Sequence, residues 1–341
     1  MRHPALAVLL TASISAFAGS AAAAVVIEFV PVDDPGNESD ILIHCTQTDC
    51  GSVATPYVIG KYEVTNQQYA EFLNAVADAD PNGLYSVNMS IDARGGITRG
   101  GSSGSYSYAV KPGRENNPVI YVSFHDALRF ANWLHNGQPT GPQGAGTTED
   151  GAYTITPGGV ATNTIVRNAG AGYFLPTENE WYKAAYYDTG LGIYYDYATS
   201  TNTTPVSGPP PGGANSANYW SGSYALTGSP NFDNAFNYLS DVGAYASAVS
   251  PNGTFDQAGN VWEWNETIAA APTTYRVKRG GDWNDQDAYL ASGLGVTGDP
   301  GLPGEDFETG FRVAPEPGAD LLAATAALLL ALRYGWRRSG G

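Results

Sequence analysis

The sequence predicts one α+β domain with little regular secondary structure and long loops. The 341 residues are 43% hydrophobic, enough for a large core, yet they include 42 glycines and 22 prolines, which favour turns over long helices and strands. Three segments carry helix-capping patterns, and three compact motifs rich in glycine and tryptophan follow neither helical nor strand periodicity. Together these features indicate a core that is held as much by turns and motifs as by regular elements.

Three helices are expected, each beginning at a hydroxyl residue followed three positions later by an acid or amide. The capping residues are Thr65, Ser123 and Thr177, and apolar residues then recur at helical spacing. In the third helix Glu180 occupies the reciprocal capping position, so we expect it to cap the helix rather than to catalyse.

A strand is expected within residues 25–32, at the start of an N-terminal segment that covers 25–56. Residues 93–107 and 200–216 are rich in glycine, serine and proline and are expected to be long surface loops.

The three motifs are GNVWEW at 259–264, RGGDW at 279–283 and GFR at 310–312. Tryptophan brings a large area to bury, and glycine allows a sharp turn or a close approach of the backbone. Glu263 stands between two tryptophans, so its carboxylate needs a cation, a metal or several hydrogen-bond donors.

The trio resembles the formylglycine-generating enzyme (sulfatase-modifying factor) family, whose fold is related to that of C-type lectins. Residues 60–74, 117–134 and 174–185 resemble further blocks of the same family, in the same order. The resemblance therefore implies a formylglycine-generating-enzyme fold over residues 57–314, which is the size of a single domain.

The resemblance also implies structural calcium. One ion would be held by carboxylates and main-chain carbonyls on a tight turn, which suits a hard cation. Its ligands would be Asp256, the carbonyls of Gly259 and Val261, and Glu263. A second ion would be held by Asn218, the carbonyl of Tyr219, Asn234 or Asp233, and the carbonyl of Phe236. The alternative for Glu263 is a carboxylate held by backbone N–H groups without metal.

Copper is not expected. Family members that make formylglycine hold copper(I) with two cysteines, spaced C-x4-C, between the second and third motifs, and this sequence has no cysteine between Trp283 and Gly310. Its two cysteines, Cys45 and Cys50, precede the domain. In an exported protein they are expected to form a disulfide, with a metal site as the alternative.

No catalytic residue is assigned. His125 and His135 are expected to flank the second helix as solvated or capping side chains. Asp282 is expected to be an exposed loop acid, with a calcium or sugar contact as the alternative. A hydrolase or lyase that uses loop carboxylates remains open, because nothing in the sequence selects one.

Charge and the two ends of the sequence indicate export. The formal net charge is −17 and no basic cluster lies within the domain, so a nucleic-acid partner is not expected. Residues 1–24 are typical of a signal peptide, as opposed to a membrane anchor. Residues 315–341 resemble a PEP-CTERM sorting signal: a Pro-Glu-Pro motif, an apolar helix and a basic end. A permanent single-span anchor is the alternative, but the apolar run is short for one.

The sorting signal implies processing by an exosortase-type membrane peptidase after transient contact with the inner membrane of a Gram-negative-type bacterium. The expected destination is the cell surface or the extracellular matrix. The expected function is that of a noncatalytic, calcium-stabilised binding module for an extracellular polysaccharide or a surface protein. The alternative is a formylglycine-generating oxidase acting on a sulfatase cysteine.

Overall fold

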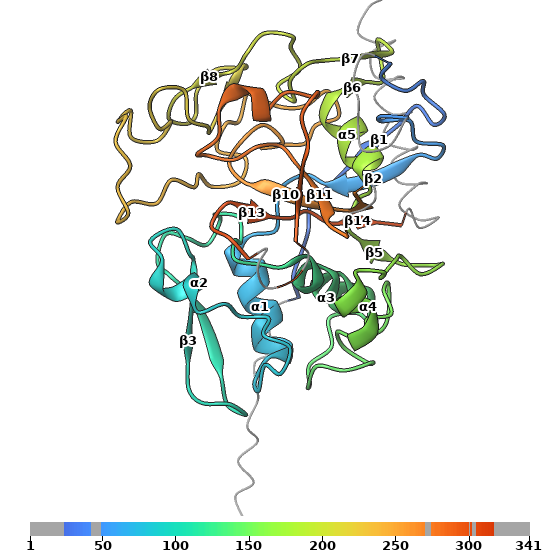
Figure 1. The fold of residues 1–341 in the computed structure, drawn as a ribbon, viewed down its shortest axis with the longest axis vertical. Coiled ribbons are helices and arrows are strands. Elements are labelled where there is room, and N and C mark those ends of the chain that lie inside the picture. Colours follow the sequence, from blue (N-terminus) through green and yellow to red (C-terminus); the bar gives the residue numbers. More distant parts are fainter. Residues whose placement is uncertain (1–23, 42–48, 270–273, 300, 302–304, 317–341) are drawn as a thin grey trace, which may run out of the picture.

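A four-stranded sheet in the order β12-β11-β10-β13 brings the three motifs together (Figure 1). Strand β10 (Trp262–Ile268) pairs antiparallel with β11 (Arg276–Arg279) and parallel with β13 (Thr309–Gly310). Strand β12 (Val296–Gly298) pairs with the outer side of β11. The first motif runs into β10, the second begins at the end of β11, and the third begins in β13.

The three predicted helices are confirmed, with their capping boxes. They are α1 (Asn66–Val76), α3 (Phe124–His135) and α5 (Glu178–Tyr186). Glu180 does cap α5, since its Oε2 accepts a hydrogen bond of 2.7 Å from the Thr177 backbone N–H. Satisfying the free N–H groups at a helix start fixes where the helix begins.

The remaining elements are short. The strands outside the central sheet form two-stranded pairs, namely β1 (Phe29–Val32) with β2 (Tyr57–Gly60), β3 (Ile97–Gly100) with β4 (Ser107–Val110), β5 (Tyr173–Phe174) with β14 (Ala314–Pro315), β6 (Tyr187–Asp188) with β7 (Ile193–Tyr194), and β8 (Val206–Ser207) with β9 (Ser216–Ala217). Helices α2 (Asn88–Ile91) and α4 (Pro157–Thr162) and the 3-10 turn η1 (Asp287–Tyr289) complete the set.

The predicted loops hold more structure than the sequence suggested. Residues 93–107 contribute to the β3–β4 hairpin, and 200–216 contain β8 and part of β9. In the hairpin Ile97 and Tyr108 are buried in the core while Thr98 and Arg99 are not, so one side chain from each strand anchors an otherwise more exposed ribbon. The expected strand within 25–32 forms only from Phe29.

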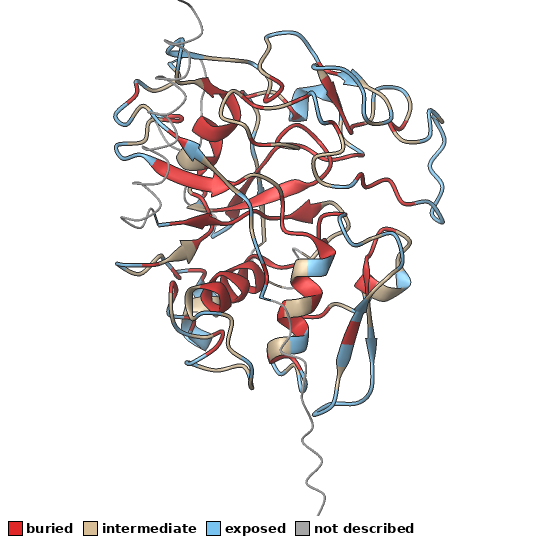
Figure 2. Cartoon of the chain, turned by 180° about the vertical axis from the view of Figure 1, so that it is seen from behind, coloured by how far each residue is buried: buried red, intermediate tan, exposed pale blue. Residues whose placement is uncertain are grey.

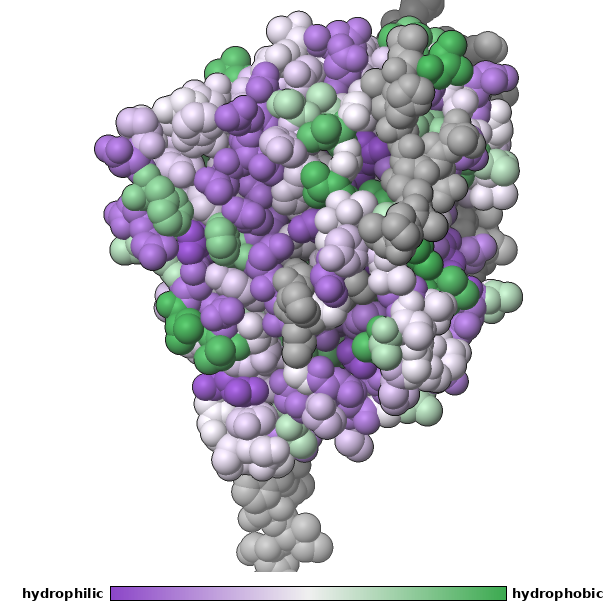
Figure 3. Space-filling view, viewed as in Figure 1, coloured by the Kyte–Doolittle hydropathy of each residue, from purple (hydrophilic) through white to green (hydrophobic). Residues whose placement is uncertain are grey.

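The core lies on both sides of the central sheet. The larger apolar cluster includes α1 and α3, and a smaller one surrounds α5. Figure 2 shows buried residues in the sheet and in these helices, while exposed residues follow the connecting loops. The face seen in Figure 3 is mainly hydrophilic with scattered apolar groups, which is ordinary for a protein surface.

The computed structural model describes residues 24–41, 49–269, 274–299, 301 and 305–316. Cys45 lies outside these ranges, as does most of the predicted signal peptide (1–24) and of the predicted sorting signal (315–341), of which residues 24, 315 and 316 are described. Among the residues that are described, no helix has the length and apolar character needed to cross a membrane.

Candidate functional site

A buried ion pair joins the first and third motifs. Arg312 donates to both carboxylate oxygens of Glu263, with Nη2 to Oε1 at 2.6 Å and Nε to Oε2 at 2.5 Å. The Trp181 indole N–H donates to Oε2 at 2.8 Å. Both charged side chains are fully buried. Glu263 is therefore satisfied by an arginine and a tryptophan from distant parts of the chain, neither of which sequence reasoning had paired with it.

Two further carboxylates lie close enough to Arg312 and Glu263 to affect their charge. Glu63 follows strand β2 and is 2% exposed. Its Oε2 has no hydrogen-bond partner in the part of the chain that is described. Burial, then Asp256 and Glu263, raise the pKa of Glu63. Burial also raises the pKa of Asp256, to about 6. Three carboxyl groups thus lie near one arginine, and the raised pKa values of Glu63 and Asp256 mean that gathering further negative charge there is unfavourable.

Of the first predicted calcium ligands, Asp256, Gly259 and Val261 precede β10 and Glu263 lies within it. Asp256 has a positive φ of 61° and accepts a hydrogen bond of 2.5 Å from the Gly243 N–H. It also lines a small cavity of about 10 Å³, the size of one water or ion. The Gly259 carbonyl accepts the Val261 N–H at 3.0 Å. The Glu263 carboxylate, by contrast, is directed to Arg312.

These residues fit a calcium ion in part. The unpartnered Oε2 of Glu63 and the Asp256 carboxylate are hard oxygen donors within a cluster of carboxyl groups, which favours a cation. Among the described residues, however, no three acidic, histidine or cysteine side chains are grouped as metal ligands. A calcium ion here would have to take several main-chain carbonyls or waters as ligands, and Glu63 was not among the predicted ones.

The second predicted set is spread over two environments. Asn218 is buried, and its amide donates to the Tyr238 carbonyl at 2.8 Å and to Asn260 Oδ1 at 3.1 Å. The Tyr219 carbonyl accepts from the Ser207 hydroxyl at 2.6 Å. Asn234 and Phe236 lie on an exposed loop. Asn218 therefore contacts the turn of the first site, and a second calcium site remains a prediction.

The second motif places an acid, Asp282, just before the loop in which the resemblance expects copper cysteines. The expectation that Asp282 is exposed is wrong: it is 1% exposed, and its Oδ1 accepts the N–H groups of Asn284 at 2.6 Å and Asp285 at 3.0 Å. Burial, then Glu308 and Asp285, raise its pKa. The side chain turns inward because it closes a tight turn of its own loop. Carboxylates are hard ligands and would not replace thiolates for copper(I).

Both histidines lie within α3 rather than beside it, because the capping box at Ser123 starts the helix one residue before His125. His135 Nδ1 accepts the Gly172 N–H at 2.8 Å. His125 is 3% exposed, and its Nε2 has no hydrogen-bond partner among the described residues. Burial, then Arg129 and Arg276, lower the pKa of His125 to about 4, so the ring is neutral at neutral pH.

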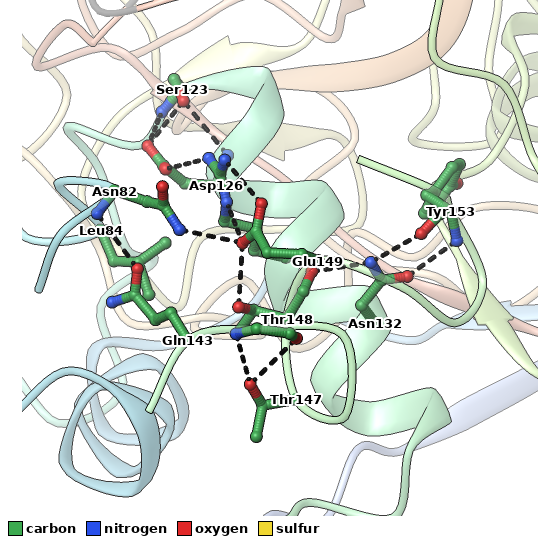
Figure 4. A network of polar contacts seen from close by, with 12 residues as sticks. Asn82, Leu84, Ser123, Asp126, Asn132, Gln143, Thr147, Thr148, Glu149 and Tyr153 are labelled. Atoms are coloured by element: carbon green, nitrogen blue, oxygen red, sulfur yellow. Dashed lines mark hydrogen bonds and ion pairs between the residues drawn. The ribbon is translucent and has the colours of Figure 1, made fainter. Parts of the chain in front are cut away.

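A polar network extends from the start of α3 (Figure 4). Asp126 Oδ2 accepts from the Ser123 hydroxyl at 2.6 Å and from the Ser123 N–H at 3.0 Å. Arg129 donates to Glu149 through Nε at 2.8 Å and Nη2 at 3.1 Å. Asn82 donates to the same carboxylate at 3.0 Å. The sequence predicted the capping pair Ser123 and Asp126. It did not predict the contacts of Asn82 and Glu149, because these residues are brought together by the tertiary structure.

Asp126 gives a pH prediction. Burial raises its pKa to about 6, above the usual 3.8, although Arg129 and Ser123 oppose the rise. Its stabilising contribution is therefore complete below pH ~4 and lost as pH rises through ~6. The free energy of unfolding of the wild type minus that of Asp126→Asn is expected to fall by roughly 2 to 3 kcal/mol between those limits. Urea unfolding across this range measures it.

The control for this experiment is Asp150→Asn, at an exposed position beside Glu149. This variant should follow the pH dependence of the wild type. A difference between wild type and Asp126→Asn that stays constant with pH would contradict the raised pKa.

Cys50 is buried against the α5 cluster and is disulfide-bonded. Cys45 lies outside the described residues, so the pairing of the two cysteines stays a prediction.

Comparisons with known proteins agree with this architecture. Residues 46–317 match the sulfatase-modifying factor enzyme 1-like domain. The chaperone protein LppX of Paenibacillus barcinonensis is 24% identical, over 69% of this chain and 72% of its own length. The formylglycine-generating enzyme of Thermomonospora curvata is 28% identical, over 77% of this chain and 83% of its own length. Among solved structures, that of CarF superposes with a TM-score of 0.52 at 22% identity, covering 85% of this chain and 98% of CarF.

Proposed function

Because the chain belongs to the sulfatase-modifying factor family, we propose that it is an exported, noncatalytic member that acts as a calcium-stabilised extracellular binding module. The proposal rests on one observation: the family motifs that build the core are present, while the loop that would hold the copper ligands lacks them. The Glu263–Arg312 pair holds the motifs together in the core, whereas the segment between Trp283 and Gly310 has no cysteine, and its described acidic residues are partly buried or exposed. The chain has the frame of the family without the soft ligands of its copper chemistry.

Calcium would neutralise the carboxylates gathered around Arg312. Under this proposal Asp256, the carbonyls of Gly259 and Val261, and an oxygen of Glu63 or Glu263 hold one ion. The unpartnered Glu63 Oε2 supports it, because a buried carboxylate oxygen without a partner is costly. The second ion, on Asn218, the Tyr219 carbonyl, Asn234 and the Phe236 carbonyl, is proposed from the resemblance alone.

The partner is proposed to be an extracellular polysaccharide or a surface protein. One relative, LppX, is named a chaperone, which is a binding activity. Export through the signal peptide, transient contact with the inner membrane and release by an exosortase-type peptidase are part of the same proposal. They rest on the sequence of the two ends and lead to the cell surface or matrix.

Calcium is expected to stabilise the fold. At a concentration one hundred times the dissociation constant the gain would be about 2.7 kcal/mol, measured by unfolding in calcium chloride and in EGTA. Asp256→Asn and Glu63→Gln should reduce this gain. Both should also raise stability in EGTA, because each removes one of three carboxylates that share Arg312.

Glu28→Gln is the matched control, since the Glu28 side chain is largely exposed and pairs with Lys61. It should leave the calcium gain unchanged. Equal unfolding temperatures in calcium and in EGTA would refute the calcium part of the proposal.

The alternative function is that of a formylglycine-generating oxidase, which family membership alone would suggest. Incubation of the purified protein with copper(I), oxygen and a sulfatase-type cysteine peptide separates the two. The noncatalytic proposal expects no aldehyde, and measurable aldehyde formation would overturn it.

A further inference from the structure

A cavity of about 430 Å³ opens at the start of α3, away from the predicted calcium ligands. This volume is within the range of roughly 300 to 1,000 Å³ that small-molecule sites occupy. Its polar lining is supplied by Ser123, His125, Asp126, Arg129, Glu149 and Thr156. Its apolar lining includes Pro81, Pro157 and Val160. Separate parts of the chain, near residues 81–82, 123–129, 149–161 and 301, thus converge on one hollow that no motif accounts for.

One buried group in this lining lacks a partner. His125 Nε2 is buried, and no described residue hydrogen-bonds to it. Leaving such a group unsatisfied costs about 1 to 3 kcal/mol. Thr156 Oγ1 accepts the Gly159 N–H at 3.0 Å, so its own hydroxyl hydrogen is left to donate. The cavity lining therefore has hydrogen-bonding groups that are not satisfied by the described residues.

The charges in the lining are largely paired with one another. Arg129 forms a two-point hydrogen-bonded pair with Glu149, and its Nη1 lies 3.6 Å from Asp126 Oδ1. The Asp126 carboxylate also caps α3, whose N-terminal end carries partial positive charge. Because acidic and basic side chains alternate in the lining, a charged ligand that approached one opposite charge would also lie close to a charge of its own sign. A neutral ligand whose groups both donate and accept hydrogen bonds could bond to the acidic, the basic and the hydroxyl side chains of the lining.

We propose that this cavity binds a neutral saccharide unit. Hydroxyl groups would donate to the carboxylates of Asp126 and Glu149 and accept from Arg129 and Thr156. The C–H face of the sugar ring would lie on Pro157 and Val160. The inference rests on the proposed function and deepens it, because it names the class of ligand and the place on the fold where part of a polysaccharide would bind.

The test is ligand-observed NMR on the full exported domain with glucose, galactose, mannose, maltose and cellobiose. Glucosamine and glucuronate serve as charged analogues. At least one neutral sugar is expected to bind with a dissociation constant on the order of 1 mM, and more tightly than its charged analogue. Ala161→Trp fills the cavity from an exposed position of α4 and should weaken binding by about tenfold or more.

Thr162→Trp is the matched control, because Thr162 is the exposed neighbour that does not line the cavity. It should bind as the wild type does, and equal unfolding temperatures would show that both variants are folded. Three results would overturn the inference: no binding of any neutral sugar at roughly 50 mM, equal binding by Ala161→Trp, or binding of the charged analogues alone.

Failure of this inference is distinguishable from failure of the proposed function. One outcome is that Ala161→Trp still binds an insoluble polysaccharide such as cellulose and its disaccharide. In that case the cavity is not the binding site, but the proposal that the protein is a binding module is retained. If the wild type shows neither calcium stabilisation nor any glycan or protein partner, the proposed function itself fails.

Discussion

Replacing Arg312 by methionine is expected to lower the free energy of unfolding by about 3 to 5 kcal/mol. The substitution removes the guanidinium that donates to Glu263, while Glu63 and Asp256 remain nearby. Arg312 also donates to the carbonyls of Gly60 at 2.8 Å and Phe255 at 2.9 Å, which would lose their donor. Chemical unfolding in the absence of calcium measures the loss.

Two comparisons make this prediction specific. The double variant Arg312→Met/Glu263→Gln should recover part of the loss, because the remaining partner no longer carries a charge. Lys61→Met breaks the exposed pair with Glu28 and should cost no more than about 1 kcal/mol. An Arg312→Met variant as stable as Lys61→Met would show that the pair does not hold the motifs together.

The parts of the fold that the sequence predicted are those fixed by neighbours in the chain. Thr65, Ser123 and Thr177 cap their helices by bonds that reach only three residues along the chain. A local pattern is enough for such contacts. The same capping rule identified Glu180 as structural, and its contact with Thr177 agrees.

The contacts that define the site are not local. Glu263 and Arg312 are 49 residues apart, and Trp181 reaches Glu263 across 82 residues. A sequence shows that Glu263 needs a partner but not which cation supplies it, and calcium and arginine satisfy the same electrostatic demand. His125 was misplaced for a related reason. The capping box gave the helix start, but which face of α3 is covered depends on segments far along the chain.

The two clusters of carboxylates illustrate how one scaffold separates two roles. Around Arg312, Glu63 and Glu263 are buried and Asp256 is partly buried, where a cation would stabilise the fold. At the start of α3 the acids Asp126 and Glu149 line an open cavity and are paired with Arg129. Under the two proposals the first cluster would hold the cation and the second would meet the ligand, so calcium dependence and ligand binding should be separable by substitution.

Trp264→Ala is expected to destabilise the protein by about 3 to 5 kcal/mol, because it empties the largest fully buried position of the first motif. Trp264 is fully buried and packs edge-on against Phe124 at a centroid distance of 6.1 Å. A Cβ on Gly298 would lie 2.7 Å from the ring, so glycine is needed there to admit it. Thermal or urea unfolding measures the loss, and a cost below about 1 kcal/mol would contradict the packing.

Trp264→Phe separates the two contributions of this side chain. The indole N–H donates to the Val122 carbonyl at 3.0 Å, just before the Ser123 cap of α3. Phenylalanine keeps most of the apolar volume but leaves that carbonyl without its donor, which should cost about 1 to 3 kcal/mol. If the phenylalanine variant lost as much as the alanine variant, the hydrogen bond to the segment before α3 would dominate. The expected ordering, with alanine clearly worse, would instead show that the motif stabilises the sheet mainly through the area its tryptophan buries.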